Sequence, residues 1–461
     1  MKISPNEMSP NETSPQAVLT NTKSPLAPQE YAILPAIKGV QISTINAGIK
    51  YQGRDEMLLM SFVDAHNSNN YNNDEDSGAH IAGVYTRSQT AAAPVAWCRA
   101  ACAGGKIKAL LVNAGNANAF TGAKGVADTQ ILAETVAKHL NCDAEDVMIC
   151  STGVIGEFLP IDKMVQGIHG LIDGLIDGLK TSQDKSATLD ATFGANGDCW
   201  AKAAKTIMTT DTFPKILTRT VKIGDTTVNI NGIAKGSGMI APDMATMLGF
   251  IVTDANLPSY VLQPLLSRYA QKTFNSITVD SDTSTNDTLL LIATGAASHA
   301  PISNAGDELL DDFKAGLRDL MQDLAIQIIC DGEGATKLIT INVSGAENEE
   351  SARIIGLAVA NSPLVKTALA AGDPNWGRII AAIGKSERWV NEHNITLHIG
   401  DELVASGACV AASYSEAKAK QHLALSHVNL HINVGVGEGK ATVWTCDLTE
   451  DYIKINANYR T

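Results

Sequence analysis

The residues best suited to chemistry lie near the middle of the chain, in the segment Lys235–Leu248, which reads KGSGMIAPDMATML. Here a lysine and two glycines precede Thr246, which directly follows the small Ala245. A threonine hydroxyl is a weak nucleophile, but a free α-amine on the same residue, which titrates at about pH 8, can activate it. That amine becomes free only if the peptide bond between Ala245 and Thr246 is cut. A buried strand with an incidental Ala-Thr step fits the same residues.

Other familiar catalytic and ligand-binding patterns are missing from the sequence. There is no GxxxxGK[ST], and no GxGxxG that follows a predicted strand, so a nucleotide site is not supported. GxSxG, HExxH and CxxC are also absent, which removes the usual hydrolase and zinc patterns. His427 and His431 alternate with apolar residues, which is typical of the outward face of a half-exposed strand. We therefore expect no metal and no cofactor.

Length, composition and charge exclude several classes of protein. The 461 residues, of which 45% are hydrophobic, are typical of a globular chain with a large core. The net charge of −14 argues against nucleic acid or an anionic membrane as a partner. No apolar stretch reaches the roughly 18 residues of a spanning helix. The sequence shows no recognisable signal or transit pattern, and the spacing of its cysteines does not suggest a disulfide framework. We therefore expect a cytoplasmic protein.

The elements that must position these residues alternate along the chain. Residues 1–30 predict a disordered tail rich in Ser, Pro, Asn and Glu. Residues 220–233 predict a hairpin that turns at Gly224-Asp225. Further strands are predicted at 108–113, 147–151, 288–293 and 338–343, and helices at 128–140, 257–273 and 308–330. The mixture predicts an α/β or α+β fold of layered sheets and helices, with a large domain at 31–353 and a smaller C-terminal α/β domain at 354–461.

The segment around Thr246 closely resembles the self-cleavage region of the ArgJ-type ornithine acetyltransferases, also called arginine biosynthesis bifunctional proteins. Six further blocks resemble that family in its order: 113–122 (NAGNANAFTG), 151–156 (STGVIG), 207–215 (IMTTDTFPK), 330–337 (CDGEGATK), 361–379 (NSPLVKTALAAGDPNWGRI) and 455–461 (INANYRT). The resemblance covers residues 42–461 and implies a layered α-β-β-α sandwich of the ornithine acetyltransferase and aminopeptidase type.

The resemblance also implies roles for individual residues. Thr246 would be both the residue at the cleavage site Ala245/Thr246 and the acyl-accepting nucleophile, and Thr152 and Gly153 would form the oxyanion hole. The substrate contacts would be Thr209, Lys235, Thr246, Glu333, Asn456 and Thr461. The residue types agree with an amino-acid substrate, because Lys235 can pair with a carboxylate and Glu333 with an ammonium.

The function implied is a ping-pong acetyl transfer in arginine biosynthesis. Acetyl would pass from N2-acetylornithine to Thr246 and then to glutamate, giving N-acetylglutamate. Some relatives also accept acetyl-CoA as donor, and no residue decides this point here. Self-cleavage would produce two chains, with two copies of each in a heterotetramer. Two alternatives stay open: a self-processing hydrolase with water as acceptor, and a non-catalytic binding protein with the same fold.

Overall fold

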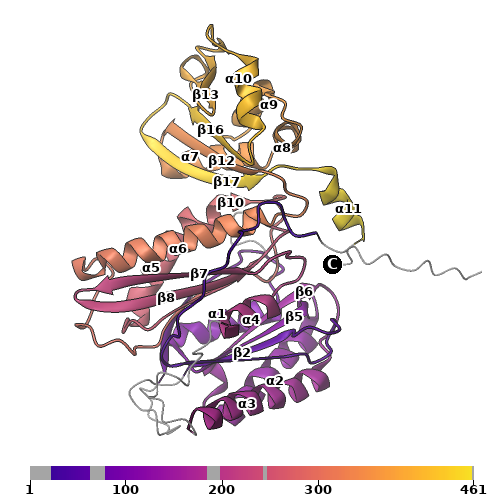
Figure 1. Cartoon of the computed structure of the whole chain (residues 1–461), viewed down its shortest axis with the longest axis vertical. Helices are drawn as coiled ribbons and strands as arrows, with labels where there is room; N and C mark the ends of the chain where they lie inside the picture. Colours follow the sequence, from indigo (N-terminus) through magenta and orange to yellow (C-terminus); the bar gives the residue numbers. More distant parts are fainter. Residues whose placement is uncertain (1–21, 63–77, 184–197, 242–246, 459–461) are drawn as a thin grey trace, which may run out of the picture.

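The computed structural model describes residues 22–62, 78–183, 198–241 and 247–458. The N-terminal half of the fold contains a four-stranded sheet that is covered by two helices (Figure 1). Its strand order is β1 (Val40–Ile45), β2 (Met57–Phe62), β5 (Ala109–Asn116) and β6 (Val147–Val154). Only β5 and β6 run parallel. Helices α2 (Gly122–Leu140) and α3 (Ile161–Gln183) cover the outer face. The helix predicted at 128–140 is thus confirmed and begins earlier, at Gly122.

The second sheet is six-stranded and packs on the first. Its order is β4 (Lys106–Ile107), β3 (Ala79–Tyr85), β11 (Thr288–Ala293), β9 (Leu248–Thr253), β8 (Thr226–Lys235) and β7 (Lys215–Ile223). Strands β9 and β11 are parallel, and the other neighbours are antiparallel. Strands β7 and β8 form the predicted hairpin with Gly224-Asp225 between them. Helices α5 (Ser259–Lys272) and α6 (Asp311–Cys330) cover the outer face (Figure 1).

Alternating side chains explain why these layers stack. On β5, Leu110 and Val112 face the second sheet, whereas Ala109 and Leu111 face the helices α2 and α3. On β11, Leu290 and Ile292 enter the same inter-sheet core, and Leu289 and Leu291 pack toward α5 and α6. A strand with both faces buried must be apolar throughout, as β11 (TLLLIA) nearly is. The predicted layered α-β-β-α arrangement is confirmed. Helices α1 (Ala93–Ala101) and α4 (Asp198–Thr206) complete this part.

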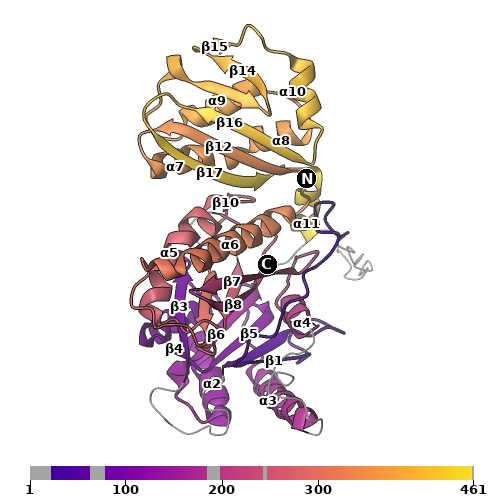
Figure 2. The same ribbon diagram turned by 60° about the vertical axis from the view of Figure 1, so that its left-hand side comes forward.

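A third, seven-stranded sheet forms the unit at the far end of the molecule (Figure 2). Its order is β10 (Ile277–Thr278), β17 (Gly439–Cys446), β12 (Leu338–Ala346), β16 (His427–Asn433), β13 (Thr396–Ile399), β14 (Glu402–Ser406) and β15 (Cys409–Val410). Its helices are α7 (Glu349–Ala360), α8 (Pro363–Ala370), α9 (Trp376–Gly384) and α10 (Glu416–Leu423), and α11 (Glu450–Asn458) follows. On β16, His427 and His431 are exposed.

Two segments lie near the domain limits expected from the sequence. Strand β12 and the start of α7 precede residue 354, yet Ile339, Ile341 and Ala352 belong to the core of the third sheet's unit. In the expected tail, Ser24 bonds through its N–H to Thr212 Oγ1 (2.9 Å) and through its hydroxyl to the Cys330 carbonyl (2.5 Å). The exact domain limits stay a prediction. No helix in the described ranges combines the length and apolarity needed to cross a membrane.

Candidate active site

The end of β6 brings a hydroxyl and a backbone N–H to one edge of the first sheet. Gly153 pairs with Gly115 of the parallel strand β5. Its φ of +133° lies in the region that favours glycine, and a Cβ there would sit 2.2 Å from the Gly115 carbonyl carbon. The neighbouring Thr152 is buried. The predicted strand at 147–151 therefore extends through both residues of the predicted oxyanion hole, and only glycine fits at 153.

Lys235, the last residue of β8, meets Thr152 across the two sheets. Its Nζ lies 3.0 Å from Thr152 Oγ1, and the residue as a whole is only 3% exposed. An ammonium group can only donate, so the Thr152 oxygen accepts and its own hydrogen is free to donate elsewhere. Burial lowers the pKa of Lys235, and the nearby Asp211 partly opposes that shift. Lys235 thereby orients the hydroxyl of Thr152.

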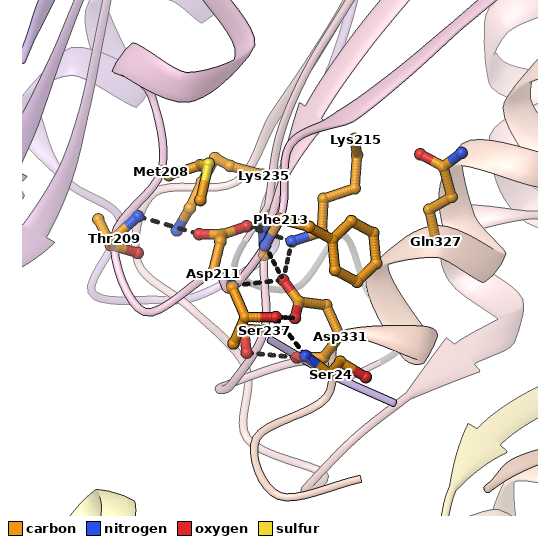
Figure 3. Close-up of polar contacts among 12 residues, drawn as sticks. Ser24, Met208, Thr209, Asp211, Phe213, Lys215, Lys235, Ser237, Gln327 and Asp331 are labelled. Atoms are coloured by element: carbon orange, nitrogen blue, oxygen red, sulfur yellow. Dashed lines mark hydrogen bonds and ion pairs between the residues drawn. The ribbon is translucent and has the colours of Figure 1, made fainter. Parts of the chain in front are cut away.

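A buried ion cluster, Asp211–Lys215–Asp331, lies beside Lys235 (Figure 3). Lys215 Nζ bonds Asp211 Oδ1 at 2.6 Å and also bonds Asp331, and all three side chains are fully buried. The Asp211 carboxylate also accepts the N–H of Thr209 (2.9 Å) and of Gly236 (2.7 Å). Burial alone would raise the pKa of Asp211, but Lys215 and Lys235 hold it below its usual range. The cluster therefore fixes the backbone on both sides of the site.

Glu333 supplies the opposite charge at the loop after α6. Its Oε2 accepts a 2.7 Å hydrogen bond from Nδ2 of Asn456, which α11 carries back to the site. Its N–H donates to the Ser237 carbonyl at 3.2 Å. Gly238 lies against the carboxyl group, since a Cβ there would approach it to 2.5 Å. Burial raises the pKa of Glu333, although the hydrogen bond from Asn456 opposes the shift.

These side chains line a single cavity. Of the residues predicted from the resemblance, it holds Thr152, Gly153, Thr209, Lys235, Glu333 and Asn456. Thr246, Ala245 and Thr461 lie outside the described residues. The lining also includes Gly238, one of the two glycines noted before Thr246, and residues that sequence reasoning did not assign to the site: Ala117, Ile155, Thr210, Met239, Ser284, Thr285 and Asn286. Thr210 could have been found, because it neighbours Thr209 in the block IMTTDTFPK.

The first described residue after the predicted cut lies close to this cavity's wall. Met247 precedes β9, and its N–H donates to Oδ1 of Asp287 at 2.8 Å. Asp287 directly follows the cavity residue Asn286 and is fully buried. Burial raises the pKa of Asp287 well above its usual range, against the effect of the Met247 N–H and of Lys235. The start of β9 is therefore tied to the segment that lines the cavity.

Comparison with known proteins places the chain in a family. A sequence profile described as the ArgJ family matches residues 41–461. The chain belongs to the ArgJ family. The arginine biosynthesis bifunctional protein ArgJ of Agrobacterium fabrum is 46% identical over 440 residues, 95% of this chain and 98% of the relative. The protein of the same name from Brucella suis is 47% identical over the same shares. The family resemblance seen in the sequence is confirmed.

Two solved structures also match parts of this chain. An arginine biosynthesis bifunctional protein ArgJ from Bacillus halodurans is 41% identical, with a TM-score of 0.44, and the match covers 46% of this chain and 98% of that one. An ornithine acetyltransferase from Mycobacterium tuberculosis, solved as a complex with ornithine, is 31% identical with a TM-score of 0.33, and the match covers 45% and 93%.

Proposed function

We propose that this ArgJ family member is a self-processing acetyltransferase of arginine biosynthesis that moves acetyl from N2-acetylornithine to glutamate. One observation carries the proposal: a lysine and a glutamate of opposite charge line the same cavity as the hydroxyl of Thr152 and the N–H of Gly153. An amino-acid substrate carries both charges, and an acyl-transfer step needs donors for an oxyanion. The curated relatives named above are called arginine biosynthesis bifunctional proteins.

Processing comes first in the proposed sequence. Cleavage between Ala245 and Thr246 would free the α-amine of Thr246, which takes the proton of its own hydroxyl, directly or through water. The next residue, Met247, donates a hydrogen bond from its N–H to Asp287, which lies beside the cavity, and this is consistent with Thr246 acting there.

Transfer then takes two half-reactions at one site. Thr246 Oγ attacks the acetyl carbonyl of N2-acetylornithine, and Thr152 and Gly153 donate to the tetrahedral oxyanion. Ornithine leaves with the proton held by the amine, and an acetyl ester remains on Thr246. The amine of glutamate then attacks the acetyl ester and gives up a proton, which returns to Thr246 Oγ as the ester bond breaks. N-acetylglutamate is released, and the hydroxyl of Thr246 is regenerated. Lys235 would pair with the substrate carboxylate and Glu333 with the side-chain ammonium of ornithine, with Thr209, Asn456 and Thr461 as neutral contacts.

The chemistry needs no metal and no cofactor, and acetyl-CoA would enter only as a second acetyl donor. The two chains would assemble as a heterotetramer with two copies of each, in the cytoplasm. No nucleic acid or membrane partner is expected.

An assay with two acceptors tests the proposed function. The purified protein is incubated with N2-acetylornithine, with and without glutamate, and acetate and N-acetylglutamate are both measured. We expect N-acetylglutamate and ornithine in equal amounts when glutamate is present. Acetate release at the same rate without glutamate would identify a hydrolase instead. If neither N2-acetylornithine nor acetyl-CoA is consumed, the protein is a non-catalytic binding protein with the same fold. A parallel reaction with acetyl-CoA and glutamate tests the second donor.

A further inference from the structure

The residue Asn286 ties the part of β6 directly before the predicted oxyanion donors to the segment that follows β5. Its Nδ2 donates to the carbonyl of Ala117, just after β5, at 2.6 Å and to the carbonyl of Ser151 on β6 at 2.8 Å. Both hydrogens of the amide are thereby used. Ser151 is the residue before Thr152, so this bond holds the backbone directly upstream of the predicted donors. Asn286 is 6% exposed and lines the cavity.

The next residue, Asp287, holds the other reacting segment. Its Oδ1 accepts the N–H of Met247, and its backbone carbonyl accepts the N–H of Thr86 at 3.0 Å. The link is reciprocal, because the N–H of Thr288 donates to the carbonyl of Met247 at 3.1 Å. Strand β11 starts at Thr288, which pairs with Leu248 at the start of β9. The two consecutive residues directly before β11 therefore contact the neighbours of the predicted oxyanion donors and of the predicted nucleophile.

We infer that Asn286 and Asp287 are a positioning pair that holds the oxyanion donors of β6 in register with Met247, the residue that directly follows the predicted nucleophile. This inference rests on the proposed function. Acyl transfer requires the attacking oxygen and the oxyanion donors to be aligned within about 0.5 Å. Thr152 and Gly153 lie on β6 of the first sheet, and Met247 directly precedes β9 of the second, so keeping these two segments aligned needs a rigid connection between the sheets. Asn286 and Asp287 provide it through short, buried hydrogen bonds.

A matched asparagine separates positioning from general stability. Asn231 on β8 is fully buried, donates from Nδ2 to the Pro35 carbonyl at 2.7 Å and accepts from Thr218 Oγ1 at 2.8 Å. Asn286→Ala and Asn231→Ala each remove a buried amide with comparable bonds, and both should lower Tm. Only Asn286→Ala should also lower kcat, by about 10- to 100-fold, with KM within about twofold, because a misplacement near 1 Å has effects of this size.

The experiment measures kcat and KM per processed molecule, self-cleavage on a denaturing gel, and Tm for the unmodified protein and both variants. Slower self-cleavage and a lower kcat per processed molecule in Asn286→Ala, at a Tm no lower than that of Asn231→Ala, are the expected result, since cleavage needs the same alignment of Thr246. A kcat within about twofold of the unmodified protein, or an equal loss in Asn231→Ala, overturns the role of Asn286. If the unmodified protein transfers no acetyl group, the proposed function itself is refuted and this inference with it.

Asp287 gives a second and independent comparison. Asp287→Asn keeps an oxygen that can accept the Met247 N–H, whereas Asp287→Ala does not. For a positioning role we expect Asp287→Asn to retain kcat within about fivefold and Asp287→Ala to lose about 10- to 100-fold. Equal losses in both variants would overturn the positioning role, because the charge rather than the hydrogen bond would then be required. This pair of variants also decides the inference if Asn286→Ala does not fold.

Discussion

At the scale of single residues, the bond from Lys235 to Thr152 gives direction to a hydroxyl that could otherwise rotate. Because Lys235 can only donate, Thr152 must accept from it and can offer its own hydrogen to an oxyanion. A side chain at 152 therefore needs an oxygen that both accepts and donates. Serine meets this requirement, and valine has the shape of threonine without the oxygen.

The paired variants Thr152→Ser and Thr152→Val test this requirement. We expect Thr152→Ser to keep kcat within about tenfold and Thr152→Val to lose about 10²–10³-fold, the usual effect of removing one oxyanion donor. Steady-state kinetics with N2-acetylornithine and glutamate measure both values, and Tm shows whether each variant is folded. A Thr152→Val enzyme with near-normal kcat would mean that the hydroxyl does not act in the reaction.

Glu333 makes the activity depend on pH in a defined direction. Burial raises the pKa of Glu333 above its ordinary value of 4.5, and only the ionised carboxylate above that pKa can pair with an ammonium. In the proposed mechanism, the Thr246 α-amine already lowers kcat/KM as it is protonated below about pH 8. We expect a separate acid limb from Glu333 at lower pH, with a midpoint above 4.5, and Glu333→Gln to remove only this limb and to lower kcat/KM at neutral pH.

Glu333 should affect the stability of the fold in the opposite direction to its effect on activity, because ionisation of its carboxyl group lowers the free energy of unfolding. A carboxyl group whose pKa is raised on folding favours the folded state when protonated and opposes folding once it ionises, as the pH rises through the raised pKa. At pH 7.5, Glu333→Gln should thus have a Tm at or above that of the unmodified protein. A lower Tm together with an unchanged acid limb would contradict this account of Glu333.

The sequence predicted only part of this site. The physical reason why a residue could or could not be predicted differs from one residue to the next. The segment around Thr246 suggested its chemistry locally, through residue types. Glu333 and Asn456 came only from family resemblance, because their contact joins residues 123 positions apart and depends on α11 folding back. Asn286 gave no local signal at all, since its importance lies in the carbonyl groups of Ala117 and Ser151 that it contacts.

At the scale of elements, the helices α5 and α6 were predicted close to their observed bounds. The hairpin β7–β8 was predicted with the correct turn, but it begins earlier than expected, at Lys215. The beginning of α2 was missed, because the turn of small residues before it carries no apolar period and is held by side-chain hydrogen bonds. Asn118, for example, bonds the carbonyl of Gly125 and the hydroxyl of Thr129. Such polar networks depend on residues that meet only in the folded chain, so period-based reasoning does not see them.

The ion cluster Asp211–Lys215–Asp331 connects β7 to the end of α6, and its loss should unfold this junction. Lys215→Met would leave the two buried carboxylates without the cation that bridges them, and breaking such a buried arrangement typically costs about 3–5 kcal/mol. We expect a loss of that size in the free energy of unfolding by urea. Lys222→Met on the same strand, where the side chain is exposed, is the control and should change it by less than about 0.5 kcal/mol. Equal effects in the two variants would rule out a stabilising role for the cluster.

At the scale of the whole molecule, the predicted cut divides the second sheet without separating it. Strands β9 and β11 follow residue 246 and lie between β3 and β8, which precede it. The site has the same mixed origin, with Thr152 and Lys235 before the cut and Glu333 and Asn456 after it. Neither chain alone could then hold a complete cavity or a complete sheet.

This interleaving predicts that cleavage changes the covalent structure but not the particle. We expect a denaturing gel to show two chains, residues 1–245 and 246–461, in place of one 48.5 kDa band, and native size exclusion to elute both together. Thr246→Ala should stay uncut, elute at the same position and transfer no acetyl group, because the sheet needs no cut to form whereas the nucleophile does. In urea, the two chains should separate only in the transition that unfolds the second sheet. Separation of the chains before that transition would refute the interlocked arrangement, and a single uncut band from the active protein would refute self-processing.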